Sequence, residues 1–81
     1  MVTPESIKTS IESGFACKHV EVRGDGQHWE AVIVSDAFEG LGKVRQHQLV
    51  YAALGDRMRE EIHALSMTTL TPTQWTAARN K

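Results

Sequence analysis

Thiols and long apolar runs are nearly absent from this chain. Its 81 residues include a single cysteine, Cys17, which excludes an internal disulfide and any metal site built from several thiolates of this chain alone. Its position just before a predicted strand indicates a small buried residue rather than a reactive thiol. No apolar stretch approaches the roughly 20 residues that cross a bilayer, and the opening "MVTPESIKTS" lacks the regions of a signal peptide. We therefore expect a cytoplasmic protein with no membrane partner.

An excess of positive charge is also missing. The formal net charge is −1 with the histidines neutral, whereas a domain that binds phosphate backbones strongly usually carries a basic excess. The chain also has no serine or cysteine in a nucleophile elbow and no glycine-rich phosphate loop. These absences disfavour strong non-specific nucleic-acid binding and indicate a protein that is not an enzyme.

The composition that remains is that of a folded domain. Apolar residues make up 41% of the chain and charged residues 23%, which is close to the average for soluble globular proteins. A chain of this length has room for one small core. We therefore expect a single domain over residues 1–81.

The first half of the sequence predicts a helix and then a hairpin. Thr3 can cap a helix that runs from about Pro4 to Ser13, and Gly14 can close it in a left-handed conformation. The stretch "KHVEVR" alternates as a strand does, and "HWEAVIVS" is predicted to be its partner strand. The second stretch is apolar on both faces near its end, which indicates a central strand. The turn at 24–27 joins them as a hairpin.

The second half predicts two helices, a strand and a final helix. The glycine and aspartate at 55–56 divide a helical region into a long and a short part. From His63 the apolar period changes to two, which predicts a third strand with Leu65 and Met67 on the side of His63. The stretch "TPTQ" at 71–74 predicts the capping box of a helix that carries Trp75 at the edge of the core. The residues expected on one face of the helical region are Leu41, Val44, Tyr51, Leu54 and Met58.

This order of elements predicts an α+β fold of two layers. A hairpin followed by a helical crossover back to the same sheet gives a three-stranded mixed sheet with helices on one face. The neighbour of the third strand stays open at this point.

Four histidines are many for so short a chain, and imidazole changes charge near neutral pH. His28 lies where the hairpin turn meets the second strand, and His63 opens the third strand. His47 lies in the long helix beside its apolar face, which favours packing or an interface. His19 alternates outward beside Glu21 and needs no special role. Without further information, each histidine is more often a solvated or hydrogen-bonded polar residue than a metal ligand or a base.

Three stretches give the chain a resemblance to a known family. They are "GDGQHWE" in the hairpin, "FEGLGKVRQHQLVYAAL" through the long helix and "IHALSMTTLTPTQW" near the end. On these motifs the sequence from Ile7 to Trp75 resembles the BolA family, and within it the IbaG-type branch with a histidine in the hairpin loop. The resemblance implies an αββαβ fold similar to the class II KH fold, in agreement with the order predicted from periodicity and caps.

The resemblance also implies a partner and a shared cofactor. BolA-type proteins partner monothiol glutaredoxins and share a [2Fe–2S] cluster with them, which implies an adaptor in iron–sulfur cluster trafficking or in iron or acid-stress sensing. It carries ligand roles over to His63 first and to His28 second, while the glutaredoxin would supply a cysteine and a glutathione. Alone, the protein is expected to be an apo monomer or a weak homodimer, since one or two histidines do not hold a cluster.

The alternative that the resemblance implies is a DNA-binding transcriptional regulator acting through the helix-turn-helix-like segment at 41–61. Many BolA proteins carry Arg-His-Arg where this chain has Gln46-His47-Gln48, so two cations that could contact phosphate are absent. The GxxG loop of KH modules is absent as well. The candidates for a partner or nucleic-acid surface are Lys43, Arg45, His47, Arg57 and Arg59.

Overall fold

The observed elements follow the predicted order with one short addition. The computed structural model describes residues 2–60, 62 and 64–80. Its elements are α1 (Pro4–Gly14), β1 (His19–Gly24), β2 (His28–Val34), the 3-10 turn η1 (Asp36–Phe38), α2 (Lys43–Leu54), α3 (Arg57–Glu60), β3 (Ala64–Leu70) and α4 (Pro72–Arg79). The sequence did not indicate η1, which begins where the Ser35 hydroxyl accepts a hydrogen bond from the Ala37 N–H at 3.0 Å.

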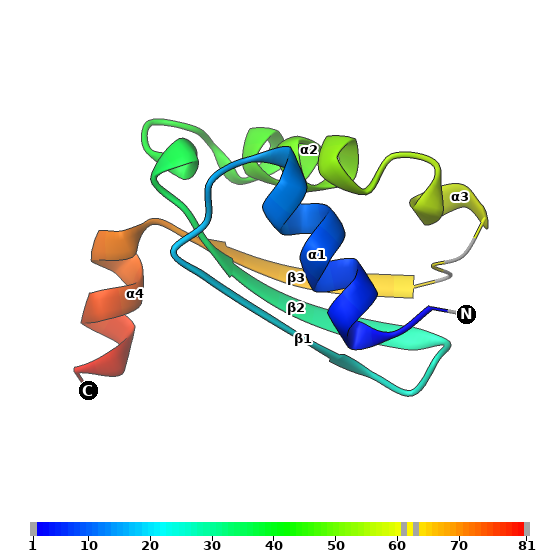
Figure 1. The fold of residues 1–81 in the computed structure, drawn as a ribbon. Helices are drawn as coiled ribbons and strands as arrows, with labels where there is room; N and C mark the ends of the chain where they lie inside the picture. The colour runs from blue at the N-terminus through cyan, green and yellow to red at the C-terminus, as the bar shows by residue number, and fades with distance from the viewer. Residues whose placement is uncertain (1, 61, 63, 81) are drawn as a thin grey trace.

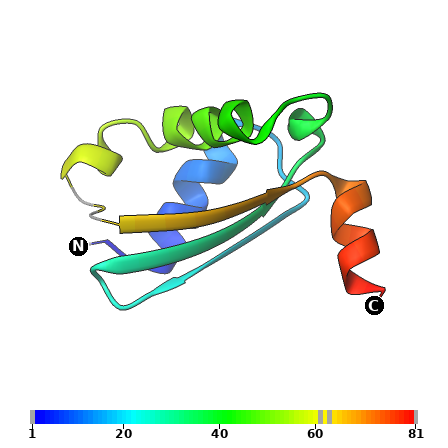
Figure 2. The same cartoon turned by 180° about the vertical axis from the view of Figure 1, so that it is seen from behind.

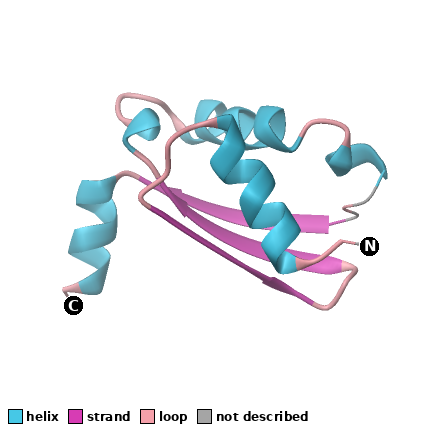
Figure 3. Cartoon of the chain, viewed as in Figure 1, coloured by secondary structure: helices cyan, strands magenta, loops and turns pink. Residues whose placement is uncertain are grey.

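The sheet is mixed, as predicted, and its strand order is β1-β2-β3. β1 and β2 form the antiparallel hairpin, while β2 and β3 run parallel. Figure 3 shows the three strands side by side, with β2 in the middle. The prediction of a central second strand is confirmed. The strand that pairs with β3, which the sequence left open, is β2.

The molecule has two layers, which confirms the predicted α+β fold. Helices α1 and α2 cover one face of the sheet, and α4 stands beyond the end at which β3 finishes (Figures 1 and 2). The core lies between the layers and is formed by Ile7, Ile11, Val20, Trp29, Ala31, Ile33, Phe38, Val50, Leu54 and Ile62. None of the described helices has the length and apolar character needed to cross a membrane.

The two predicted helix caps are present. The Thr3 hydroxyl accepts a hydrogen bond from the Ser6 N–H at 3.1 Å, and the Thr71 hydroxyl accepts one from the Gln74 N–H at 3.2 Å. In both cases the side chain of the third residue pairs in return with the cap backbone, which satisfies donors that a helix start would otherwise leave free. Local sequence alone therefore determines where α1 and α4 begin.

The predicted left-handed conformation of Gly14 is wrong. The described glycines with positive φ are Gly26, Gly40 and Gly55. A Cβ atom at Gly14 would lie 2.3 Å from the Cβ atom of Ala53 in α2. Glycine at this position therefore allows α1 and α2 to approach closely, which is a tertiary requirement rather than a property of the helix end.

The apolar face predicted for the helical region is buried only in part. Leu54 is buried, but Val44 is 72% exposed and Tyr51 is 43% exposed. The face of α2 that meets the core instead carries Gln46, Val50 and Leu54, which are spaced by four residues and so form one row along the helix. A polar residue occupies one of these buried positions, and apolar periodicity therefore selected the wrong row. Outside α2, Leu41 and Met58 are half-buried.

Trp75 and His19 have a contact that the sequence did not reveal. Trp75 in α4 is half-buried, and its ring stacks on His19 of β1 with centroids 4.8 Å apart and planes 19° apart. The Arg79 guanidinium lies 4.7 Å from the centroid of the same indole. His19 therefore does have a structural role, since it joins α4 to the end of the sheet.

Candidate metal-ligand site at the hairpin end of the sheet

The two candidate ligands belong to strands that begin at the same end of the sheet. His28 is the first residue of β2, and its Cα partner is Ala64, the first residue of β3. His63, which precedes Ala64 in the sequence, lies outside the described residues. The structure therefore places His28 beside the start of β3 and leaves the position of His63 as a prediction.

The hairpin turn fixes the backbone of His28 through one residue, Asp25. The Oδ1 atom of Asp25 accepts hydrogen bonds from the N–H groups of Gln27 and His28, each at 2.9 Å. In return, the Asp25 N–H donates to the His28 carbonyl at 3.2 Å. The N–H donors of His28 and then Gln27 hold the pKa of Asp25 below its usual value, because they stabilise the ionised carboxylate.

The neighbouring glycines are required by this geometry. Gly26 has a φ of 102°, a conformation that side chains with a Cβ atom rarely adopt. A Cβ atom at Gly24 would lie 2.4 Å from the His28 carbonyl oxygen and 2.6 Å from Cε3 of Trp29. The sequence "GDGQHW" therefore encodes a turn whose shape depends on its two glycines and its aspartate.

His28 and Trp29 point to opposite faces of the sheet, because consecutive strand residues alternate. Trp29 is 3% exposed and belongs to the core, so it holds the start of β2 against the helices. His28 is exposed, and no described group forms a hydrogen bond with its ring, although the nearby Asp25 carboxylate attracts it electrostatically. The imidazole is thus presented to solvent on a firmly held backbone.

This donor set fits a cluster only if another molecule contributes ligands. The described residues contain no group of three histidine, cysteine or acidic side chains that could hold a metal ion. Cys17 lies at the other end of the sheet, where the Lys18 N–H donates to the carbonyl of Val34 at 2.8 Å. The seven residues of β2 put that end about 20 Å from His28. A single exposed imidazole can serve as one terminal ligand, while iron–sulfur clusters are otherwise held by thiolates.

The Cys17 thiol has the properties of a structural cysteine. It is half-buried and lies 3.4 Å from the carbonyl oxygen of Phe15, to which it donates. Burial, and to a lesser degree the negative charge of Glu12, raises the pKa of the thiol above its usual value. At neutral pH the thiol is therefore protonated and poorly suited to bind a metal.

Two of the candidate cations for a partner surface are bonded within the fold. The Lys43 ammonium donates to the carbonyl of Thr69 in β3. The Arg57 guanidinium donates to the Ser6 carbonyl at 2.9 Å, to the Ser6 hydroxyl at 2.8 Å and to the Ser10 hydroxyl at 2.7 Å. These side chains join α2 to β3 and α3 to α1. Their charged groups therefore use part of their hydrogen-bonding capacity inside the fold and are less available to a partner.

The other candidates differ in exposure. Arg45 is exposed and lines a shallow hollow of about 240 Å³ with Leu41, Gln48 and Leu49. His47 is half-buried, while Arg59 lies in α3 with its side chain outside the described part of the chain. The described contacts bring neither Arg45 nor His47 to the start of β2.

Gln46 is a residue whose importance sequence reasoning missed. It is 3% exposed, and its amide nitrogen donates to the carbonyls of Phe38 at 3.3 Å and Leu41 at 2.8 Å. Its amide oxygen accepts from the buried Thr69 hydroxyl at 2.6 Å. The spacing of Gln46 with Val50 and Leu54 was the signal that could have indicated a buried position. Of the two positions at which this chain lacks an arginine, position 46 is therefore buried, while Gln48 is exposed.

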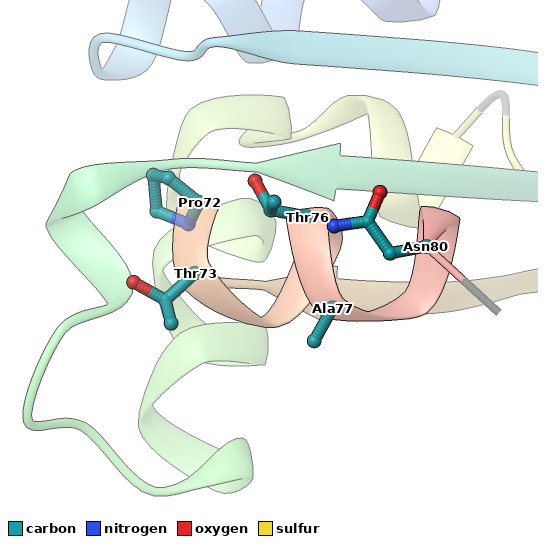
Figure 4. A pocket seen from close by; sticks show the side chains of 5 residues that line it. All are labelled: Pro72, Thr73, Thr76, Ala77 and Asn80. Atoms are coloured by element: carbon teal, nitrogen blue, oxygen red, sulfur yellow. The ribbon is translucent and has the colours of Figure 1, made fainter.

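A further hollow of about 450 Å³ lies along α4, at the end of the sheet opposite His28 (Figure 4). The residues that line it are Pro72, Thr73, Thr76, Ala77 and Asn80. None of these side chains titrates or binds metal readily, so the hollow adds no chemistry to the candidate site.

Comparison with known proteins assigns the family. A family model described as BolA-like protein matches residues 1–74. BolA-like protein 1 of Bos taurus is 36% identical over 91% of this chain, and the acid stress protein IbaG of Escherichia coli K12 is 31% identical over 90% of this chain and 88% of its own length. The DNA-binding transcriptional regulator BolA of Haemophilus influenzae is 39% identical over 73% of this chain and 57% of its own length. The chain therefore belongs to the BolA family, and the expected resemblance to its IbaG-type branch is confirmed.

A solved structure supports the same assignment. The BolA protein homologue from Coxiella burnetii is 44% identical, with a TM-score of 0.85 over 94% of this chain and 99% of that chain. The chain spans about half the length of the mammalian BolA-like protein 1 relatives, since it covers 53% of the Bos taurus protein.

Proposed function

We propose that this protein is a non-enzymatic adaptor that binds a monothiol glutaredoxin and adds an imidazole ligand to its [2Fe–2S] cluster. The observation that supports this proposal is the exposed His28 ring on a backbone that Asp25 fixes, beside the start of β3. Membership of the BolA family, with IbaG among the relatives, agrees with it.

In this proposal each molecule supplies part of the ligand set. His63, with His28 as the second candidate, would provide nitrogen, while the glutaredoxin would provide its cysteine and a glutathione. Imidazole is neutral, so when it replaces a thiolate the reduction potential of a cluster rises, and protonation at low pH removes the ligand. Such a cluster suits trafficking or sensing better than permanent electron transfer.

The two histidines need to be tested separately. The two-residue period of the sequence assigns His63 to the side of Leu65, which packs toward the core. His28 lies on the other face of β2, since Trp29 occupies the core face. Alternation alone therefore does not predict that both rings meet one iron atom. We expect the larger effect from His63, because the family resemblance gives the ligand role to His63 first.

The test is a titration of a [2Fe–2S] monothiol glutaredoxin with this protein, followed by visible absorption and circular dichroism. We expect a spectral change with the wild type that is lost in His63→Ala and reduced in His28→Ala. His19→Ala is the matched control, because His19 lies at the far end of the sheet, opposite Val34. No spectral change with the wild-type protein would contradict the proposal.

The same complex should be sensitive to acid. Free imidazole has a pKa of about 6.5, so mild acidification competes with iron for the ring nitrogen. We expect the spectrum of the mixed complex to revert toward that of the glutaredoxin alone as the pH falls below about 6. A mixed spectrum that survives mild acid unchanged would count against an acid-labile histidine ligand.

DNA binding is the second candidate, because one relative is named a DNA-binding transcriptional regulator. The net charge of −1 and the buried position of Gln46 disfavour it, as do the internal hydrogen bonds of Lys43 and Arg57. A salt series separates the two functions, since phosphate binding weakens steeply with salt and metal coordination does not.

A further inference from the structure

The hairpin turn binds His28 through both of its backbone polar groups. Both backbone groups of His28 are bonded to Asp25: its N–H donates to the carboxylate at 2.9 Å, and its carbonyl accepts from the Asp25 N–H at 3.2 Å. A second donor, the Gln27 N–H, meets the same carboxylate oxygen at 2.9 Å. The carboxylate itself is exposed, so it is not there to satisfy a buried group.

We propose that Asp25 is a positioning residue for His28, holding the backbone of the turn so that the exposed imidazole is presented to the metal centre of the partner. This inference rests on the proposed function, and it adds a residue to which no ligand role is given. The expected benefit is preorganisation, because a ligand that is already ordered loses less conformational entropy when it binds.

Three features of the turn support positioning over simple solvation. Gly26 adopts a φ of 102°, a conformation that only glycine adopts readily. Gly24 leaves space that a Cβ atom would take from the His28 carbonyl. Trp29, buried directly after His28, prevents the strand from rotating its faces. The backbone is thus constrained on both sides of a ring that itself has no described hydrogen bond.

The test compares Asp25→Asn with Asp25→Ala. Asparagine keeps a side-chain oxygen that can accept the two N–H donors, whereas alanine removes it. Glu30→Ala is the charge control, because it also removes one carboxylate. The Glu30 carboxylate forms an ion pair with Arg23 at 3.3 Å and no described hydrogen bond with the turn.

The first readout needs no metal. In the apo protein, amide hydrogen exchange by NMR should be faster at His28 and Gln27 in Asp25→Ala by about tenfold, and close to wild type in Asp25→Asn and Glu30→Ala. Unchanged exchange at the amides of β1 and β3 would show that the fold persists.

The second readout is the circular dichroism titration with [2Fe–2S] glutaredoxin and glutathione. Asp25→Ala should reproduce the reduced spectral change of His28→Ala, and Asp25→Asn should restore the wild-type change. If the wild-type protein changes the spectrum but Asp25→Ala behaves as wild type, or Asp25→Asn fails as Asp25→Ala does, positioning by Asp25 is overturned. If the wild type itself gives no change, the proposed function fails, and the apo exchange data still report whether Asp25 orders the turn.

Discussion

At the scale of single residues, the structure distinguishes polar side chains that hold the fold from those left for binding. Gln46 is buried and satisfies two carbonyls and the Thr69 hydroxyl, while His28 is exposed, and no described group forms a hydrogen bond with its ring. Residue type does not separate these cases, because glutamine is usually exposed and histidine is often solvated. The surroundings that fold around each residue decide its role.

Gln46→Ala should destabilise the protein by about 1–3 kcal/mol, because it leaves buried carbonyls and the Thr69 hydroxyl without a partner. Gln48→Ala is the matched control on the same helix, and its exposed side chain should contribute no more than about 0.5 kcal/mol. Urea denaturation of both variants measures the difference. Equal free energies of unfolding would mean that the buried hydrogen bonds do not stabilise α2.

Cys17 should react slowly with thiol reagents. Burial, with a smaller effect from Glu12, raises the thiol pKa in the folded protein. At a given pH the folded protein therefore has less thiolate than the unfolded chain. The contribution of this thiol to the free energy of unfolding is complete below the unfolded pKa and is lost as the pH rises through the folded pKa. Iodoacetamide alkylation followed by mass spectrometry across pH should give a midpoint above that of the chain in urea. A midpoint at or below the unfolded value would refute the assignment of Cys17 as a structural cysteine.

At the scale of elements, local chemistry predicted more than packing did. The caps at Thr3 and Thr71 and the period of the strands depend on neighbouring residues, so the sequence predicted the order of helices and strands. The exposed faces of Val44 and Tyr51 could not be predicted in this way. They depend on how α1 rests on α2 through Gly14, and on a glutamine that occupies a core position. Likewise, His28 and His63 were selected by family resemblance, and not by spacing alone.

The contact between α1 and α2 gives a test at this scale. Gly14→Ser should destabilise the protein by about 1–3 kcal/mol, since its Cβ atom would collide with Ala53. Gly42→Ser places the same side chain at the N-cap of α2, where nothing lies within 4 Å and no side-chain cap exists. It should be neutral or stabilising by roughly a few tenths of a kcal/mol. Thermal or urea unfolding with the two effects reversed would contradict the packing described.

The attachment of α4 to the sheet should depend on Trp75. Trp75→Ala removes the stack on His19 and the contact with Arg79, so hydrogen exchange should become faster throughout α4 while the strands keep their protection. Thr76→Ala, on an exposed position of the same helix, is the control. If protection in α4 does not change in Trp75→Ala, other contacts attach this helix.

At the scale of the whole molecule, the two ends of the sheet carry different groups. One end carries the hairpin turn, His28 and the start of β3, and the other carries α4 and Cys17. Because one or two histidines do not hold a cluster alone, the isolated protein should contain no stoichiometric iron or sulfide after purification. Iron and sulfide in the purified protein, without any partner, would oppose an adaptor role.

The most direct test of that role is a nitrogen hyperfine measurement on the reduced cluster in the mixed complex. This protein is labelled with ¹⁵N only in histidine and combined with unlabelled [2Fe–2S] glutaredoxin and glutathione. We expect a ¹⁵N coupling of an iron-bound imidazole that is weakened most in His63→Ala and to a smaller extent in His28→Ala. A complex that forms but shows no ¹⁵N coupling to iron would contradict ligation by this chain.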